Sequence, residues 1–494
     1  MSSLQRVLLD SDRRFTLAAV AALCVAAGLV AGAYTAILSP LYAVAAALAV
    51  TAALLMLHST QWSFAALIGL ICLLPFGALP FKIGFTPTFL DLALIALFFV
   101  WLMRIATGKS TELVGSPLAL PAIVFMLLAC ASFIAGMGHS ALNQYVVRHF
   151  AELLLSICLL FVALSTVQTP TQMRTLIRLL VVAGFAAALI GVVLYLLPDT
   201  LSIRILSALG RFGYPTGAGV LRYVEDDPAQ PMRAISTSTD PNVLGGLLIL
   251  ITTLSAAQLF SPRPILRHWV LAGMVLIDVL CLYLTYSRGS MAGFAVGLAI
   301  LAVVRYRKLI PLMAVGGLLL LLLPQTQEYV QHFVEGLQQQ DLATQMRLGE
   351  YKDALILIGR HPWIGVGFIS TPEASLYIGV SNVYLLIAEE TGFVGLAAFL
   401  VILGVFFREM RRAWVSMERG GEMAGILLGL AASVAGMLVG GIFDHYFFNL
   451  DFPHSVAVFW LYLGLGMTAA RLGRRQPNLP VQTDYATIME QSHF

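Results

Sequence analysis

The chain of 494 residues is 59% hydrophobic and only 11% charged, with a formal net charge of +3. Soluble domains carry about 25% charged residues, so this composition excludes a soluble globular protein, which would expose too much apolar surface to water. The apolar runs are about 20 residues long, the length of a helix across the hydrocarbon core, and they lack the roughly ten-residue alternation of membrane barrels. The sequence therefore predicts a helical integral membrane protein without a substantial soluble domain.

Fourteen apolar segments are candidate membrane spans. The run 267–304 is too long for one crossing, and we divide it at Ser287-Arg288-Gly289. If two neighbouring candidate spans were merged or formed a re-entrant pair, the count would be twelve, and each loop would stay on the same side of the membrane. We therefore predict an all-α polytopic protein with about 14 (12–14) transmembrane helices. The segments are 15–38, 40–57, 62–80, 88–106, 117–137, 147–166, 174–197, 240–260, 267–286, 289–304, 308–324, 383–407, 422–443 and 452–471.

The distribution of Lys and Arg predicts the orientation. Arg6, Arg13 and Arg14 precede the first apolar run, which has no convincing cleavage site and is typical of a signal anchor. With the N-terminus in the cytoplasm, most of the 29 basic residues fall in cytoplasmic connections, and the alternation stays in phase to the last span. We therefore expect both termini in the cytoplasm.

The predicted organisation has two long outer segments, 198–239 and 325–382. They hold most of the basic residues on the outer side, where the positive-inside rule disfavours them. We therefore expect that these charges are present because the function of the protein needs them. The alternative is that long loops are translocated regardless of charge. The predicted parts are 1–197 with helices 1–7, 198–239 as the first periplasmic loop, 240–324 with helices 8–11, 325–382 as a partly helical second loop, 383–472 with helices 12–14, and 473–494 as a cytoplasmic tail.

Arginines in the first outer segment are candidates for binding a phosphate. Arg211, Arg222 and Arg233 are spaced by eleven residues, but their flanking sequences do not match, so we take the spacing as coincidental. Arg233 leads into Asp240-Pro241-Asn242, where Asp240 is expected to cap the next helix and Pro241 to occupy its first position. The N-terminus of that helix would then point outward, which favours an anion there.

Arg288 lies between two apolar spans at the outer interface, in Tyr286-Ser287-Arg288-Gly289-Ser290. An arginine deeper in the bilayer would cost about 2.5–3.5 kcal/mol on insertion scales. Its planar fork of donors grips phosphate oxygens, and the adjacent glycine and serines allow close backbone approach. The alternative is an interfacial arginine that snorkels to water.

The second outer segment predicts a helix on the outer face. From Met346 to Gly359 the apolar residues recur near helical spacing, and Pro362 ends the pattern. Arg347 lies at its start. The motif residues that follow are Gly365, Gly367, Asn382, Tyr384, Glu389, Glu390, Gly392 and Gly395.

These segments resemble the O-antigen ligase and Wzy-type O-antigen polymerase superfamily of bacterial envelope glycosyltransferases. Four pieces in the order of the family carry the resemblance over about residues 230–400. They are Arg233 with Asp240-Pro241-Asn242, Tyr286 to Gly289, Arg347 to Gly367, and Asn382-Val-Tyr384 to Gly395.

The resemblance implies a GT-C-like, metal-independent glycosyl transfer on the outer face of the bacterial inner membrane. The donor would be a glycan on undecaprenyl diphosphate, and an acceptor hydroxyl would displace the lipid diphosphate with inversion. Arg233 and Arg288 match the arginines that hold the diphosphate, and Arg347 fits a second clamp. Asn382 and Tyr384 would lie at the substrate. The partners would be the lipid-linked donor, a glycan or lipid A-core acceptor, the bilayer and a candidate chain-length regulator.

The chain departs from the family at Ser381, where ligases are thought to need a histidine. His445, oriented by Asp444, could replace it as the acid or base. Glu389 and Glu390 remain alternatives, as do Asp451 and His454.

Neither a metal nor a cofactor is expected. The sequence contains no Walker motif, no dinucleotide fingerprint and no run of metal ligands, and we expect no nucleic-acid partner. All five cysteines lie in apolar runs, where they are expected to be small buried residues without disulfides.

Three functions remain open. The first is a polymerase that joins lipid-linked repeat units of an O-antigen or exopolysaccharide, favoured by Ser381. The second is a ligase that moves finished glycan to lipid A-core. The third is a transporter, since some relatives carry the name of bicarbonate transporters. A transporter should have broken helices and buried charges, whereas only Asp278 is expected deep in a span.

Overall fold

The computed structural model describes residues 51–475, apart from 52–53, 57–58, 80–81, 83, 109–114, 139–141, 323–341 and 369–378. The expected span 15–38 lies outside the described residues, and so does nearly all of 40–57. The tail after residue 475 is also outside them.

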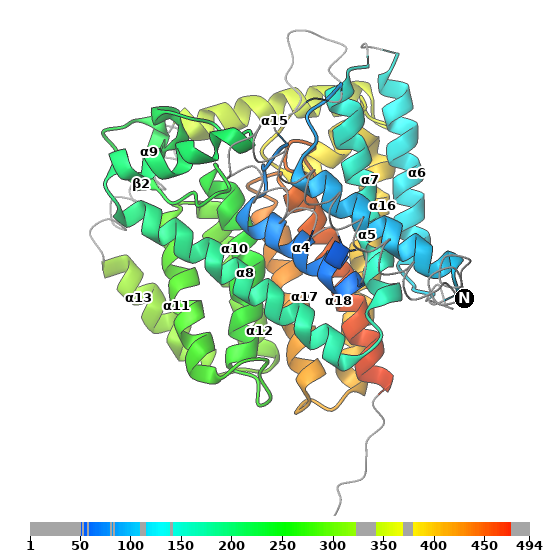
Figure 1. The fold of residues 1–494 in the computed structure, drawn as a ribbon, viewed down its shortest axis with the longest axis vertical. Coiled ribbons are helices and arrows are strands. Elements are labelled where there is room, and N and C mark those ends of the chain that lie inside the picture. The colour runs from blue at the N-terminus through cyan, green and yellow to red at the C-terminus, as the bar shows by residue number, and fades with distance from the viewer. Residues whose placement is uncertain are drawn as a thin grey trace, which may run out of the picture.

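The described chain is helical, with one small two-stranded sheet (Figure 1). Twelve helices of the described residues form a bundle, and α9 and α15 lie at one end of it, which we call the α15 end. The bundle helices are α4 (Thr60–Leu73), α5 (Phe89–Ala106), α6 (Ala119–Gly136), α7 (Gln144–Thr166), α8 (Pro170–Leu196), α10 (Pro241–Leu259), α11 (His268–Leu284), α12 (Arg288–Val304), α13 (Leu309–Leu322), α16 (Val383–Ser416), α17 (Glu422–Gly440) and α18 (Pro453–Arg475). The elements at the α15 end are α9 (Asp199–Ala208), η1 (Leu209–Phe212), η2 (Ala218–Val220), β1 (Arg222–Tyr223), η3 (Val224–Asp226), β2 (Met232–Arg233) and α15 (Leu342–Arg360).

Eight of the bundle helices are long and apolar enough to cross a membrane, and α4, α11, α12 and α13 are shorter apolar helices. This confirms the predicted polytopic all-α membrane protein, while the number of fourteen spans stays a prediction. The division of 267–304 is confirmed, because α11 ends at Leu284 and α12 begins at Arg288. The helix expected from Met346 to Gly359 is also confirmed as part of α15, which ends two residues before Pro362, while its place on the outer face stays a prediction.

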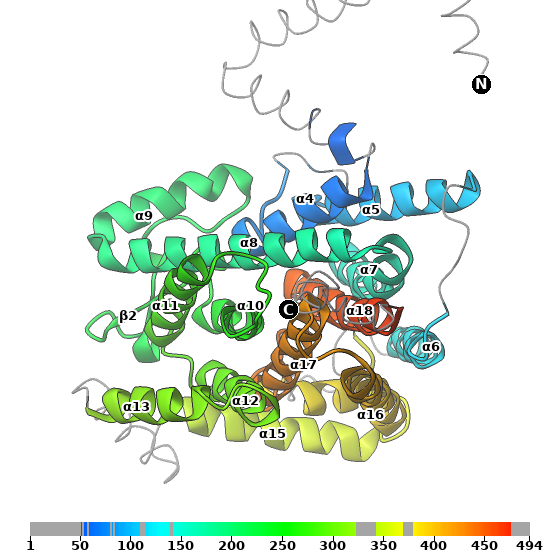
Figure 2. The same ribbon diagram turned by 90° about the horizontal axis from the view of Figure 1, so that it is seen from below.

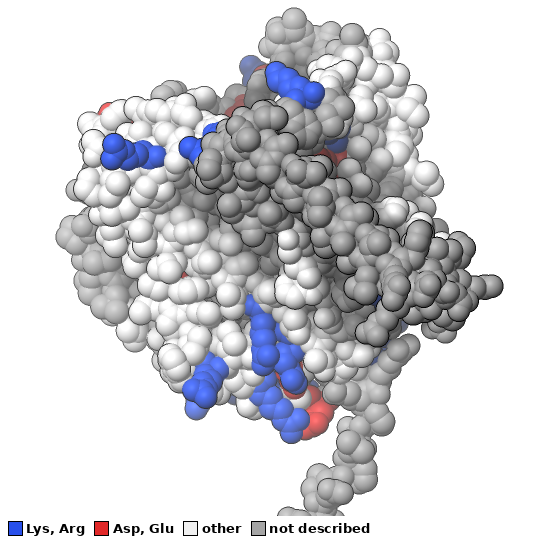
Figure 3. Space-filling view, in the orientation of Figure 1, with Lys and Arg blue, Asp and Glu red and all other residues white. Residues whose placement is uncertain are grey.

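The centre of the bundle consists of α10, α17 and α18, which are buried along nearly their whole length (Figure 2). By contrast, only 33% of α5 and 28% of α6 is buried, and α6 exposes Leu120, Leu127 and Ile134. A helix that is apolar all round and exposed on one side is stable when lipid covers that side. Lys and Arg gather at the two ends of the bundle and leave the band between them almost free on the visible face (Figure 3).

Glycines allow α12 and α17 to pack backbone to backbone. A Cβ added to Gly293 would lie 2.5 Å from the carbonyl oxygen of Gly436, and one added to Gly436 would lie 2.6 Å from that of Gly293. At the α15 end of the same pair of helices, a Cβ on Gly289 would lie 2.6 Å from the Cβ of Phe443. Small residues at such contacts are how membrane helices approach closely.

The ends of segments that the sequence predicts on the same side of the membrane lie close together in the structure. At the α15 end the Phe76 N–H donates to the Tyr214 hydroxyl (3.2 Å), and the Tyr145 hydroxyl donates to Asp451 (2.7 Å). At the opposite end Arg174, at the start of α8, forms an ion pair with Glu422 at the start of α17. Each contact joins two segment ends at the same end of the bundle, while the orientation of the loops in a membrane stays a prediction.

The helix α16 is broken at Gly392, and the segment from Pro362 to Gly367 docks into the break. Gly392 has φ +71°, which interrupts the helical hydrogen bonds. The Val366 and Gly367 amides donate to the carbonyls of Glu389 and Glu390 (2.9 and 3.0 Å), and the Phe393 amide donates to that of Pro362 (2.7 Å). A Cβ on Gly365, where φ is +75°, would lie 2.4 Å from the Glu390 backbone. The motif glycines of this region therefore form a backbone junction.

Two expectations are corrected by the structure. The segment 198–239 was expected to be a loop, but it begins with α9, whose Asp199 favours the helix N-terminus. Only Asp278 was expected deep in a span, yet Glu152, Glu389 and Glu390 are also buried. Glu152 is accommodated because it pairs with His149 (2.8 Å) and Arg148 (3.4 Å), partners that an apolar run does not reveal.

The glycine packing predicts that Gly293→Ala destabilises the protein, because the added methyl cannot fit against Gly436. Overpacking of this kind costs about 1–3 kcal/mol, so the melting temperature in detergent should fall by several degrees. The matched control is Gly273→Ala in α11, where nothing lies within 4 Å of the added Cβ, so that variant should be as stable as the wild type or more stable. Equal melting temperatures for the two variants would contradict the close packing.

Candidate functional site

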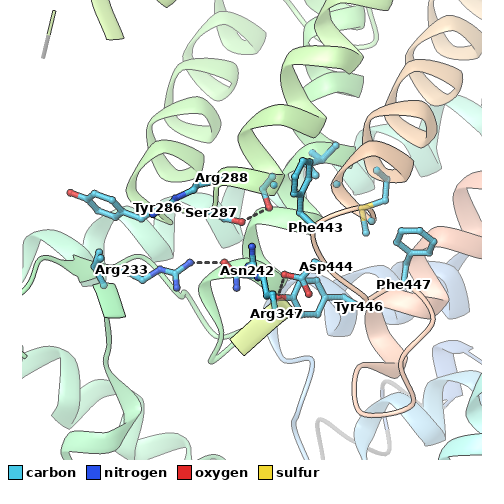
Figure 4. A pocket seen from close by; sticks show the side chains of 18 of the residues that line it. Arg233, Asn242, Tyr286, Ser287, Arg288, Arg347, Phe443, Asp444, Tyr446 and Phe447 are labelled. Carbon is cyan, nitrogen blue, oxygen red and sulfur yellow. Dashed lines mark hydrogen bonds between the residues drawn. The ribbon is translucent and has the colours of Figure 1, made fainter. Parts of the chain in front are cut away.

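A cavity of about 270 Å³ opens at the α15 end, where the ends of α10, α12 and α17 meet (Figure 4). Segments far apart in the sequence contribute to its wall: the β1–β2 hairpin, the start of α12, α15 and the α17–α18 loop. The lining residues are Tyr223, Val224, Glu225, Asp226, Arg233, Asn242, Gly246, Ile249, Tyr286, Ser287, Arg288, Gly289, Ser290, Arg347, Met437, Gly440, Gly441, Phe443, Asp444, Tyr446 and Phe447.

Arg233 is held on β2 by two neighbouring elements. Its Nε donates to the Thr285 carbonyl (2.8 Å), and its NH2 donates to the Asn242 side chain (2.5 Å). The Ala234 amide donates to the Leu284 carbonyl (2.8 Å), which fixes the hairpin to the end of α11. As the sequence predicts, Asp240 caps α10 and accepts from the Asn242 and Val243 amides. Asn242 thus lies in the first turn of α10 and directs the guanidinium into the cavity.

The N-terminus of α12 opens into the cavity. Its N-cap residue Ser287 makes no side-chain capping bond, and its hydroxyl pairs instead with that of Ser290 (2.8 Å). Tyr286 before it has φ +53°, a left-handed conformation that turns the chain sharply between α11 and α12. The first amides of a helix are positive and lack helical partners, so this end of α12 with Arg288 in its first turn favours an anion.

Arg347 reaches the cavity from α15 and lies beside Asn242 and Asp444 (Figure 4). Within the part of the chain that the structure describes, no hydrogen bond or ion pair holds its guanidinium. Its charge acts on Asp444, because it lowers the pKa of that carboxyl. A half-buried guanidinium without its own partner favours an anionic ligand.

Asp444 is the carboxyl group of the α17–α18 loop that lines the cavity. Its oxygens accept from the His445 amide (2.9 Å) and from the Tyr446 hydroxyl. Burial raises the pKa of Asp444 to about 7, and the charge of Asp240 adds to the rise. The hydrogen bonds and Arg347 act in the opposite direction. A carboxyl with a pKa near 7 exchanges a proton readily at neutral pH.

His445 is adjacent to this carboxyl but does not line the cavity. Asn449 donates to its Nδ1 (2.8 Å), and its Nε2 lies 3.9 Å from Asp444 Oδ1. Its ring packs edge-on against Phe452. Burial lowers the pKa of His445 to about 4, so the imidazole is neutral. The structure thus places His445 behind Asp444.

Other residues predicted for the site lie outside the cavity wall. Asn382 caps α16, accepting from the Tyr384 and Leu385 amides, and donates to the Ile442 carbonyl (2.9 Å). The Tyr384 hydroxyl donates to the Leu438 carbonyl (2.8 Å). Both contacts tie the start of α16 to the end of α17, so these side chains support the wall instead of forming it.

The remaining candidates are also separate from the cavity. Arg222 pairs with Arg233 across the β1–β2 hairpin, but it is exposed, and its Nε donates to the Thr239 carbonyl (3.4 Å). Arg211 is exposed on η1. Glu389 and Glu390 are buried in α16. Asp451 accepts from Tyr145, and His454 is buried against Phe76.

The sequence did not single out Tyr446, Phe443 or the role of Asn242 as the partner of Arg233. Their signal was weak, since Tyr446 and Phe443 are aromatic residues beside an apolar span, and Asn242 is a polar residue in the first turn of a helix. Among the described residues, no group of three or more His, Cys, Asp or Glu side chains is placed to hold a metal ion.

The O-antigen ligase family model matches residues 273–400. These residues are thus similar to that family. The match confirms the superfamily indicated by the sequence, and it includes Arg288 and Arg347, whereas Arg233 and Asp444 lie on either side of it. No curated protein matches the chain. The family implies a membrane-embedded enzyme acting on a lipid-linked glycan and an acceptor.

Proposed function

We propose that the protein is an inner-membrane glycosyltransferase that polymerises undecaprenyl-diphosphate-linked repeat units on the periplasmic face. One observation carries the proposal: Arg233, Arg288 and Arg347 come from three separate segments and line one cavity together with the start of α12. Arginine forks and helix N-termini are the two groups that proteins use most for binding phosphate. A diphosphate between them would leave the glycan facing Asp444.

The proposed reaction is a displacement at the anomeric carbon of the donor. An acceptor hydroxyl forms the new C–O bond, while the bond from that carbon to the diphosphate oxygen breaks and its electron pair leaves with the lipid diphosphate. The leaving group gains charge as this bond breaks, so the arginines stabilise the transition state more than the ground state. This role of the arginines supports a metal-independent transfer, and attack from the face opposite the diphosphate would invert the anomeric configuration.

Asp444 is the proposed base that takes the proton of the acceptor hydroxyl. It lines the cavity, and its pKa of about 7 suits proton transfer at neutral pH. In this proposal His445 helps to position Asp444, because its Nε2 lies 3.9 Å from Asp444 Oδ1. Glu389 and Glu390 are not proposed as bases, because they lie in α16 and not in the cavity wall.

Polymerisation is preferred over ligation because the position of Ser381 provides no proton-transfer group to the cavity. Its hydroxyl donates to Glu350 on α15 (2.7 Å).

Transport is not proposed, although α16 is broken and Glu389 and Glu390 are buried. The carbonyls that the break frees are instead bonded by the Val366 and Gly367 amides.

Replacement of Arg288 tests the diphosphate clamp. A hydrogen bond to a charged group contributes about 1.5–3 kcal/mol, so Arg288→Ala should lower turnover roughly 10–1000-fold. Arg288→Lys keeps the charge but loses the fork, so it should recover only part of the activity. The measurement is glycan transfer in vitro from purified lipid-linked donor, with Arg204→Ala on the exposed face of α9 as the control. Full activity of the lysine variant would show that Arg288 only anchors α12 at the interface.

The base assignment predicts a pH dependence. A base acts only when it is deprotonated, so kcat/KM should rise with pH up to the pKa of Asp444, about 7, and level off above it. Asp444→Asn should lower turnover by about 10²–10⁴-fold and abolish the rise, while His445→Ala should cost less than about tenfold. A loss at His445 as large as that at Asp444 would return the base role to His445.

Deletion of the gene distinguishes a polymerase from a ligase. Loss of a polymerase should leave single repeat units, either on their final acceptor or stranded on the lipid. Loss of a ligase should leave long polymer on undecaprenyl diphosphate and a bare acceptor. Mass spectrometry of the lipid-linked and acceptor-linked glycans separates the two, and long lipid-linked polymer would exclude the proposed polymerase.

A further inference from the structure

The carboxylate of Glu350 joins α15 to the start of α16. Its Oε2 accepts two hydrogen bonds from Ser381, one from the amide (3.0 Å) and one from the hydroxyl (2.7 Å). Two donors on one carboxylate oxygen form charge-assisted bonds, which are shorter and stronger than neutral ones. The pair therefore fixes the position of α15 relative to α16 at this point.

The same junction continues to the loop that carries Asp444. The amide of Val383 donates to the carbonyls of Gly441 (2.8 Å) and Asp444 (3.1 Å). The Tyr351 hydroxyl, next to Glu350 in α15, approaches the carbonyls of Ser381 (3.4 Å) and Ile442 (3.3 Å). One network thus connects α15, the start of α16 and the α17–α18 loop.

Arg347 lies three residues before Glu350, and residues at this spacing share one face of a helix. The guanidinium has no hydrogen bond or ion pair of its own within the described residues, so its place in the cavity depends on the placement of α15. Glu350 provides that placement one turn away, and it does not line the cavity. The side chain that holds the helix and the side chain that reaches the ligand are therefore different residues.

We propose that Glu350, through Ser381, is a positioning residue that presents Arg347 to an anionic ligand opposite Asp444. The inference rests on the proposed function, in which that ligand is the diphosphate of the donor. A charged donor fixed before the ligand arrives costs no reorganisation when the ligand binds or reacts. Without the junction, Arg347 keeps its charge but has to be ordered by the ligand itself.

The test uses the full chain in lipid nanodiscs, with inorganic pyrophosphate as the probe and glycan transfer as the second readout. Glu350→Ala should weaken pyrophosphate binding and lower turnover by about tenfold each, the range expected for hydrogen bonds to a charged group. Glu350→Gln keeps an acceptor oxygen for Ser381 and should recover activity to within about threefold of the wild type. Ser381→Ala keeps the amide donor and should lose about threefold. Lys352→Ala, an exposed residue of the same helix, is the matched control and should change neither readout.

The Arg347→Ala background separates positioning from folding. If Glu350 acts through Arg347, Glu350→Ala should cost less than about twofold in that background, because the group it positions is gone. An equal loss in both backgrounds would overturn the proposal. If Glu350→Ala does not fold, Ser381→Ala in the two backgrounds decides the question in the same way. Unchanged pyrophosphate binding in Arg347→Ala itself would instead sink the proposed diphosphate site.

Discussion

The close approach of α12 and α17 is the constraint on which the cavity depends. Gly293 and Gly436 bring the two backbones so near that neither position accepts a side chain. Gly289 continues the contact to Phe443 at the α15 end, where Arg288 begins one helix and Asp444 follows the other. In a bilayer the hydrophobic effect contributes little between helices, so packing of this kind determines their spacing. The distance between the cation and the carboxyl is thus set inside the apolar bundle.

The β1–β2 hairpin and α15 complete the wall of the cavity that the bundle helices begin to form. The hairpin brings Arg233 to the cavity because Ala234 is bonded to the end of α11, and α15 brings Arg347 because Glu350 is bonded to Ser381. The segment 198–239, which contains the hairpin, also has a small hydrophobic core, in which Leu206, Val220, Leu221 and Ile235 pack with Leu194 of α8. Charged side chains that would be costly among the spans are placed at their ends, where water and a ligand can compensate them.

The sequence was sufficient for the features that depend on local composition. Apolar runs located the helices, the break before Arg288 was correct, and the cap at Asp240 followed from its residue types. Arg233, Arg288 and Arg347 were selected as charges on a disfavoured side, and the structure brings them together. The spacing of such residues along the chain does not reveal this convergence, because it arises from helix packing.

Tertiary contacts explain where the predictions of individual roles fell short. Asn382 and Tyr384 were polar residues in a motif, but they bond to the carbonyls of Ile442 and Leu438 and so hold helices together. His445 and Asp444 are adjacent in sequence, and only the conformation of their loop decides which faces the cavity. The burial of Glu152 has a local reason, since its partners Arg148 and His149 lie one turn before it in α7.

The docking of Pro362 to Gly367 into α16 has a consequence for which positions of this junction tolerate substitution. The bonds of this junction join main-chain amides to main-chain carbonyls, and only Gly365, Gly367 and Gly392 have a conformation that requires a particular residue. Trp363 and Ile364 point outward and are exposed, so they are free to change without loosening the joint. A junction of this kind keeps its main-chain hydrogen bonds whichever side chains it exposes, so the surface at Trp363 and Ile364 can vary in chemistry without a change in the path of α16.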